Sequence, residues 1–271
     1  MIELILFSIA FIGSLLAGLW DLKTTEIPDE IPTLMAVFGV FIWLVSGNLY
    51  GLALSVVFGL SFLGFGWLLY KAGQWGGGDA KMLSAIGFLL PIMNNAYFGL
   101  SFFFNLFLVG LAYMIVYSLA LGFLNKGTFS RFGREFVKEK IVLIAFIALL
   151  LLAAITSAYV FIFNYTLLLE LVTIPYLLFV AAFLVIFWKY SKIVENCIFK
   201  RKIPVAKLRI GDVLLESKQW DGVEEADLQR IKRSGKRFVT IKEGVRFGMV
   251  FPIALLVTYT VGNIIFLLIG M

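Results

Sequence analysis

The chain has 271 residues, of which 61% are hydrophobic and 15% charged, with a formal net charge of +6. Its mean hydropathy is +0.99, whereas soluble globular domains have only about 45–50% apolar residues. The composition therefore excludes an ordinary soluble protein and predicts an all-α polytopic membrane protein.

Apolar runs of about 17–25 residues predict transmembrane helices. Eight candidate runs occur, at residues 2–20, 31–46, 52–69, 80–94, 97–124, 141–163, 165–188 and 248–270. The second and the fourth are short, so we expect about six to eight spans. The first run lacks the basic start and small-residue cleavage site of a signal peptide, and we expect it to remain as a helix.

We expect four parts along the chain. Residues 1–124 form a transmembrane core, 125–188 a basic loop and an additional transmembrane hairpin, 189–246 a small α+β module, and 247–271 a C-terminal transmembrane helix. Within the module, "IPVAKLRIGDVLLES" and "KRFVTIKEG" alternate like strands. Between them, "VEEADLQRIKRSG" is typical of a helix, with acids first, bases last and a glycine stop.

The basic residues indicate how the chain crosses the membrane. If there are eight spans, all 23 Lys and Arg residues fall in the odd-numbered loops or at their edges. The positive-inside rule then predicts that these loops are cytoplasmic and that both termini lie outside the cell membrane. The basic end of the seventh span, "WKYSKIVENCIFKRK", is expected to lie on anionic lipid. Nucleic acid is not an expected partner, because the basic residues are not interleaved with aromatic ones.

The chain has one cysteine, Cys197, and no histidine. A lone thiol cannot form an internal disulfide, and zinc needs about four Cys, His or carboxylate ligands. We therefore expect no metal and no cofactor. Acid–base chemistry would fall to carboxylates, Lys or Tyr.

Two aspartates are predicted at the same depth, at the cytoplasmic edge of the membrane. Asp21 closes the first span in "GLWDLKTTEIPDE", and Asp79 opens the fourth in "GGGDAKML". Packed helices lie about 8–10 Å apart, so the two carboxyls would meet if these spans touch. Such a pair shares a proton. The ionised member would take a proton from water while the protonated one polarises a peptide carbonyl, which is direct hydrolysis.

Three glycines, Gly76, Gly77 and Gly78, precede Asp79. We expect them to let a substrate backbone approach closely, to allow positive φ angles, and to leave N–H groups for pairing with the substrate. Their flexibility would let Asp79 shift toward Asp21. Lys81 would lower the pKa of Asp79 or bind a substrate carbonyl. Taken alone, Asp79 is also explained as a helix N-cap and Asp21 as an interfacial anion. The combination favours an active site, and a phosphate-binding loop is rejected because its G-x-x-x-x-G-K-[ST] pattern is absent.

These motifs resemble those of the GxGD intramembrane aspartic peptidases, and most of all the archaeal prepilin and preflagellin peptidases. The similar stretches are "GGGDAKML", "DLKTTEIPDEI" and the tail "VEEADLQRIKRSGKRFVTIKEGVRF". The resemblance implies that Asp21 and Asp79 are catalytic and that Gly76 and Gly78 are the motif glycines. The implied activity is removal of a short basic leader from type IV pilin-like precursors (archaellins, pilins), on the cytoplasmic side of the precursor's hydrophobic helix.

The sequence departs from the family pattern in two respects. A single cysteine leaves no zinc loop of the kind that bacterial members carry, and the hairpin at 141–188 has no counterpart in compact archaeal relatives. Presenilin-like peptidases share GxGD, but they prefer Tyr before the first aspartate and have a later Pro-Ala-Leu motif. Here Trp20 precedes Asp21, and no Pro-Ala-Leu occurs.

The loop after the first span is acidic. We expect Glu26, Asp29 or Glu30 to recognise the basic leader; a plain solvated loop, with Asp29 capping the second span, is the alternative. A second class of function is a small proton- or cation-coupled transporter that uses the same carboxylates. Two observations count against a transporter: the carboxylates lie at the membrane rim, and the sequence shows no internal repeat.

Overall fold

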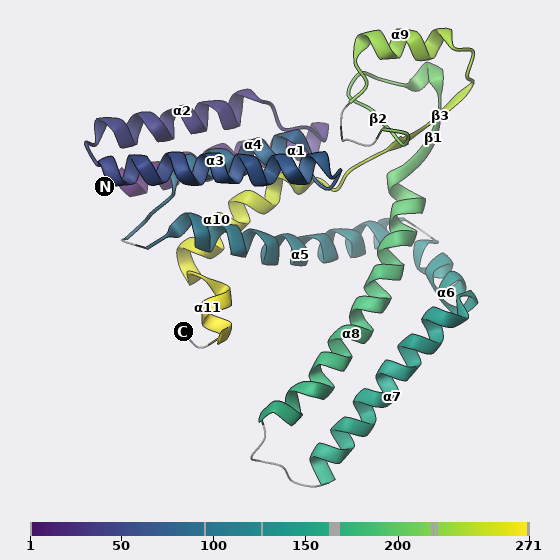
Figure 1. Ribbon diagram of the computed structural model, residues 1–271. Coiled ribbons are helices and arrows are strands. Elements are labelled where there is room, and N and C mark those ends of the chain that lie inside the picture. The colour runs from purple at the N-terminus through teal and green to yellow at the C-terminus, as the bar shows by residue number, and fades with distance from the viewer. Residues whose placement is uncertain are drawn as a thin grey trace. The chain divides into compact units, whose positions relative to one another are not determined.

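A computed structural model describes residues 2–94, 96–125, 127–162, 169–217, 220 and 222–269 (Figure 1). The chain divides into two compact units, one formed by Met1–Met114 with Lys202–Met271 and the other by Ile115–Arg201. The helices of the first unit are α1 (Ile2–Thr24), α2 (Glu30–Val45), α3 (Leu49–Lys71), α4 (Gly77–Leu89), the first part of α5 (Phe98–Leu124), α9 (Glu225–Arg233), α10 (Val250–Val261) and α11 (Ile264–Ile269).

Within the described residues, five helices are long and apolar enough to cross a membrane. They are α1, α3, α5, residues Lys140–Tyr159 of α7, and the stretch Pro175–Phe199. The segments Glu30–Val45 and Phe247–Val261 are apolar but shorter. The chain is therefore a polytopic helical membrane protein, as its composition predicted.

Two predicted spans differ from the structure. The fourth, expected over residues 80–94, is a helix only as far as Leu89. The last, expected to run unbroken over 248–270, is divided into α10 and α11 at Gly262, whose φ is +80°. The Asn105 side chain stabilises this break, because it donates to the Gly262 carbonyl (2.6 Å) and accepts from the N–H of Ile264 (3.1 Å).

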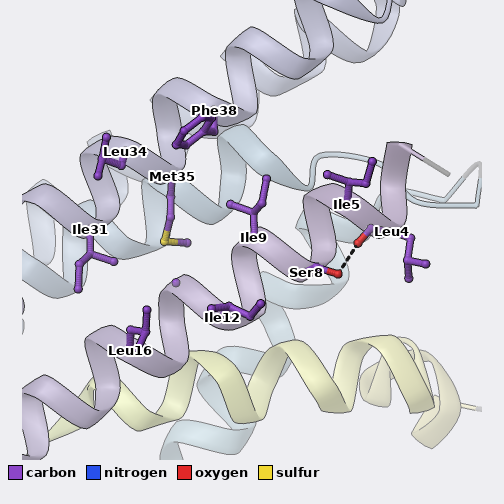
Figure 2. Close-up of a pocket in the computed structure, with 11 residues that line it drawn as sticks. Leu4, Ile5, Ser8, Ile9, Ile12, Leu16, Ile31, Leu34, Met35 and Phe38 are labelled. Atoms are coloured by element: carbon purple, nitrogen blue, oxygen red, sulfur yellow. Dashed lines mark hydrogen bonds between the residues drawn. The ribbon is translucent and has the colours of Figure 1, made fainter.

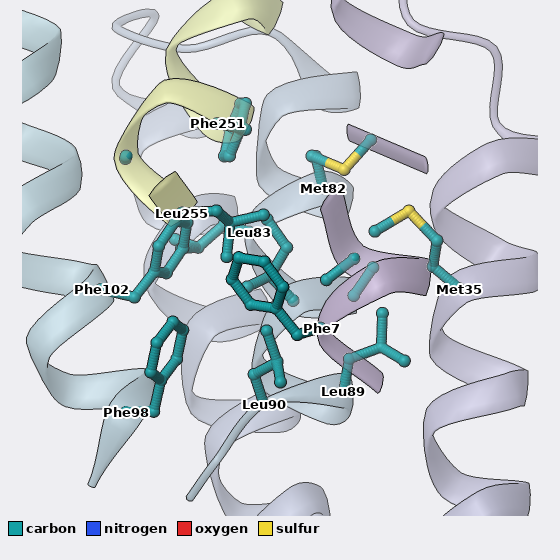
Figure 3. Close-up of a cluster of buried hydrophobic side chains, with 14 of the residues drawn as sticks. Phe7, Met35, Met82, Leu83, Leu89, Leu90, Phe98, Phe102, Phe251 and Leu255 are labelled. Atoms are coloured by element: carbon teal, nitrogen blue, oxygen red, sulfur yellow. The ribbon is translucent and has the colours of Figure 1, made fainter. Parts of the chain in front are cut away.

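The short helix α4 is the centre of the first unit, with α2 and α3 packed against it. Small residues allow the close approach: a Cβ on Gly66 of α3 would lie 2.8 Å from the Cα of Ala80. Side chains then bond to backbone carbonyls across the interfaces, Ser84 to Gly59 (2.9 Å) and Trp43 to Leu89 (3.2 Å). Figure 3 shows the surrounding core, which includes Phe7, Met82, Leu83, Phe102, Phe251 and Leu255.

The α+β part of the first unit is small. Its strands β1 (Lys200–Pro204), β2 (Val213–Leu214) and β3 (Phe238–Lys242) form a sheet in the order β1-β3-β2, with β2 and β3 antiparallel. Much of "IPVAKLRIGDVLLES" is therefore not strand. A 3-10 turn follows β1, and the predicted Gly-Asp turn is present, with Gly211 at φ +91°. Helix α9 lies between β2 and β3 in sequence, as predicted.

The second unit contains α6 (Thr128–Lys138), α7 (Lys140–Ile162) and α8 (Leu169–Val194). Helices α7 and α8 pack against each other as the predicted hairpin, whose expected turn at Asn164 lies outside the described residues. The Lys189 ammonium pairs with the Glu139 carboxylate, and the Tyr190 hydroxyl donates to the Ser118 carbonyl (3.0 Å).

A cavity of about 540 Å³ opens between α1 and α2. Figure 2 shows its lining, which is apolar apart from the Ser8 hydroxyl, and that hydroxyl donates to the carbonyl of Leu4 (2.8 Å). Neither Asp21 nor Asp79 lines this cavity.

Candidate active site

Asp21 lies near the end of α1 and points into the protein, where the residue is only 6% exposed. Its Oδ2 accepts a hydrogen bond of 2.8 Å from the backbone N–H of Gly248. Gly248 belongs to a 3-10 turn, η3 (Phe247–Met249), just before α10. A Cβ on Gly248 would lie 2.9 Å from the Cβ of Asp21 and 3.1 Å from the Cα of Gly18. Only a residue without a side chain fits this contact.

Asp79 is the third residue of α4. The helix N-cap is Gly76, so the interpretation of Asp79 as the N-cap residue is wrong. Its carboxylate instead reaches back, and Oδ2 accepts a hydrogen bond of 3.2 Å from the N–H of Gly76. This position also faces the positive end of the helix dipole.

The helices that carry the two aspartates contact each other, α1 with α4, and the charge of Asp21 acts on Asp79. Asp79 lies just before the fourth predicted span, and α4 is not one of the five long apolar helices. Asp79 keeps partial contact with solvent. Loss of water around its carboxyl and, next, the negative charge of Asp21 raise the pKa of Asp79 to about 7, against the opposing hydrogen bond from Gly76. The Asp79 carboxyl can therefore hold a proton near neutral pH.

The three glycines do not use the positive φ angles that glycine allows. Gly76 has φ −74°, and Gly77 and Gly78 are helical; in this loop the positive φ belongs to Gly73 (+70°). The glycines also differ in their surroundings. A Cβ on Gly78 would lie 2.8 Å from the Cβ of Ile27, whereas the nearest atom to a Cβ on Gly77 is 4.0 Å away. Gly78 thus permits close packing, and the Gly76 N–H is already bonded to Asp79.

Lys81 does not act on Asp79 as predicted. Its ammonium lies 2.5 Å from Oδ2 of Asp29, with both side chains well exposed, and it is not among the groups that shift the pKa of Asp79. Asp29 stands at the N-cap position of α2, but its side chain makes no capping hydrogen bond within the described residues. The predicted cap position is thus correct, but the Asp29 carboxylate accepts a hydrogen bond from Lys81 instead of from the helix backbone.

Glu26 and Glu30 lie on either side of Asp29 and are exposed. Glu26 approaches the turn of the α+β part, since a Cβ on Gly211 would lie 2.9 Å from its Oε1. Glu30 is in the first turn of α2. These carboxylates are placed at the surface of the loop that links the Asp21 helix to α2.

Two contacts at the site were missed from the sequence. Gly248 was recognised only as the start of an apolar run, although its N–H binds Asp21. Trp220 carries no motif, yet its indole N–H donates to the carbonyl of Gly73 (2.9 Å), in the loop that leads to Asp79. The Lys242 ammonium lies over the Trp220 ring, 4.6 Å from its centroid.

The described residues contain no cluster of three or more Cys, Asp and Glu side chains placed to hold a metal ion. The chemistry that the arrangement offers on its own is that of two interacting carboxyls. One of them is anchored by a backbone N–H, and the other is able to hold a proton near neutral pH.

Comparisons with known proteins give the family. The chain is similar to the preflagellin peptidase of Methanocaldococcus jannaschii, with 30% identity over 92 residues (32% of this chain, 39% of the relative). It is also similar to that of Methanococcus maripaludis, with 29% identity over 147 residues (48% and 63%). The alignments thus cover less than two thirds of either relative. No solved structure matches significantly.

A broader match covers both aspartates. The family model described as "Type IV leader peptidase family" matches residues 8–190, well over half of the chain. This chain therefore belongs to the type IV leader peptidase family.

Proposed function

We propose that this protein is a membrane-embedded aspartic endopeptidase that removes the short basic leader of type IV pilin-like precursors, archaellins or pilins. The observation that carries the proposal is the contact between α1 and α4, which carry Asp21 and Asp79 from distant parts of the chain, with the charge of Asp21 acting on Asp79. The names of the similar proteins support the same substrate class.

The reaction follows from the protonation of the pair. The ionised carboxylate takes a proton from a water molecule, and the oxygen of that water attacks the scissile carbonyl carbon. The protonated carboxyl donates to the carbonyl oxygen and gives a tetrahedral diol. Collapse of the diol breaks the C–N bond, and the leaving amine takes up a proton. No covalent intermediate forms with the enzyme.

Leader recognition is assigned to the exposed carboxylates Glu26 and Glu30. Asp29 is already paired with Lys81, so it contributes less negative charge to a basic leader. Replacing both Glu26 and Glu30 by Lys should slow cleavage of leaders that carry Lys or Arg, and should spare a leader whose basic residues are replaced by Gln. Equal slowing of both leaders would contradict the assignment.

The orientation in the membrane is also part of the proposal. The distribution of Lys and Arg supports odd-numbered loops in the cytoplasm, both aspartates at the inner membrane face and anionic lipid beside the basic segments. The leader of a precursor that has not yet crossed the membrane would then be within reach of the site.

The test is incubation of the detergent-solubilised full-length protein with a pilin-type precursor, followed by mass spectrometry. Asp21→Asn and Asp79→Asn should each abolish loss of the leader. Asp227→Asn, in α9, is the matched control that should cleave normally. Retained cleavage by Asp79→Asn would refute the mechanism. Proton or cation flux into proteoliposomes in the absence of any cleavage would favour the transporter instead.

A further inference from the structure

We propose that the backbone N–H of Gly248 fixes Asp21 as the ionised member of the pair, so that Asp21 is the general base and Asp79 the general acid. This assignment rests on the proposed peptidase function and goes beyond it. Gly248 is a positioning residue, because it touches the base and not the substrate.

The hydrogen bond from Gly248 to Asp21 is short. At 2.8 Å it lies near the short end of N–H···O distances, and it is shorter than the 3.2 Å bond from Gly76 to Asp79. An amide N–H can only donate, so it favours the form of the carboxyl that carries the negative charge. The backbone of Gly248 lies close against Asp21, since a Cβ on Gly248 would be 2.9 Å from the Asp21 Cβ and 3.0 Å from Oδ2.

The donor is itself held in place on both sides. Two residues earlier, the Arg246 carbonyl accepts a hydrogen bond from the hydroxyl of Tyr113 (2.8 Å). Next to Gly248, the ring of Phe247 packs against that of Trp75, 5.7 Å between centroids. The N–H is therefore aimed at Asp21 by α5 and by the loop before α4, and not by α10 alone.

Burial removes water from both carboxyls, and what distinguishes them is their partners. The charged groups that act on Asp21 are Arg246, whose positive charge favours a carboxylate, and Asp79 on α4. Asp79 has a longer hydrogen bond, 3.2 Å from Gly76, and faces the negative charge of Asp21. Its raised pKa, about 7, agrees with its holding the shared proton.

The experiment measures protonation directly. A hydrophobic carbodiimide reacts with protonated carboxyls, and peptide mass spectrometry then gives the labelled fraction of each aspartate as pH is varied. In the detergent-solubilised full-length protein, Asp79 should be labelled up to about pH 7, and Asp21 should resist labelling over the same range. Preferential labelling of Asp21 would overturn the assignment.

Two substitutions should displace the Gly248 N–H from Asp21, one at Gly248 itself and one at Gly18, the residue of α1 that faces it. Gly248→Ala forces the contact with Asp21 apart, and Gly18→Ala places a Cβ 3.0 Å from the carbonyl carbon of Gly248. Both should extend Asp21 labelling to a pH about one to two units higher. Gly64→Ala, on α3, is the control, because its Cβ would meet no described atom within 4 Å. If Gly248→Ala does not fold, the labelling of Asp21 and Asp79 in Gly18→Ala and in the wild-type protein still tests the assignment.

Kinetics separate positioning from a merely structural effect. Both variants should lower kcat about 10- to 100-fold with KM nearly unchanged, and should move the acidic limb of the pH–rate profile to higher pH. A lower kcat with an unmoved acidic limb of the pH–rate profile would overturn the base assignment. Unchanged Asp21 labelling in an active Gly248→Ala variant would do the same. Either result would leave the proposed peptidase function standing. Absence of cleavage by the wild-type protein would overturn the proposed function, and the base assignment with it.

Discussion

The two glycines before Asp79 should respond very differently to the addition of one methyl group. In Gly78→Ala the new Cβ would lie 2.8 Å from the Cβ of Ile27, a distance that requires the loop or the start of α4 to move. In Gly77→Ala the nearest atom is 4.0 Å away. Overpacking of this kind costs about 1–3 kcal/mol. If it displaces Asp79 from Asp21, the cleavage rate should fall about 5- to 150-fold.

The assay is single-turnover cleavage of a pilin-type precursor, with thermal unfolding in detergent as a check on folding. Gly77→Ala is the matched control and should cleave within about threefold of the wild type. Because the clash is with a Cβ, Ile27→Gly should restore part of the rate in the Gly78→Ala background, whereas Ile27→Ala should not. Equal losses in Gly77→Ala and Gly78→Ala would refute the reasoning, because both would then act through backbone flexibility.

Three further outcomes are expected. Because the pKa of Asp79 is raised to about 7, its acid form is present below that pH and is lost above it, and the cleavage rate should fall about tenfold per pH unit on the alkaline side; a flat rate to pH 9 would contradict this. Lys81→Gln removes an exposed pair with Asp29 that is worth about 0–1 kcal/mol, so melting temperature and cleavage should barely change; a collapse of the rate would mean that Lys81 contacts substrate. Trp220→Phe removes the hydrogen bond to Gly73, worth about 0.5–1.5 kcal/mol, and should make that loop about 2- to 10-fold more sensitive to limited proteolysis; unchanged sensitivity would show that the bond does not hold the loop.

The features that the sequence predicted well are those set by local composition. A long apolar run such as 52–69 predicts a helix even when the helices packed against it are unknown. The reason is that backbone N–H and C=O groups in lipid must form hydrogen bonds within the segment. A carboxylate beside an apolar run is equally visible, and Asp21 and Asp79 were identified in this way. The contact between α1 and α4 was inferred only from the equal depth predicted for Asp21 and Asp79. The central position of α4 depends on close packing at small residues such as Gly66, which the local pattern does not show.

The errors arose where tertiary contacts determine a residue's role. Gly78 was expected to leave room for a substrate backbone, but the close neighbour of its Cα is Ile27, which lies 51 positions earlier in the sequence. Lys81 was expected to act on Asp79 or on a substrate carbonyl, whereas its ammonium pairs with Asp29, at the N-cap of α2. The break at Gly262 is stabilised by Asn105 of α5. None of these partners is visible in the local pattern.

The α+β part of the first unit contacts both segments that carry the aspartates. It ends at Arg246, and two residues later the N–H of Gly248 binds Asp21. Through Trp220 it binds Gly73, in the loop before Asp79. A movement of this part would therefore change the anchoring of both carboxyls. This arrangement explains how a segment outside the membrane helices contributes to a site built from α1 and α4.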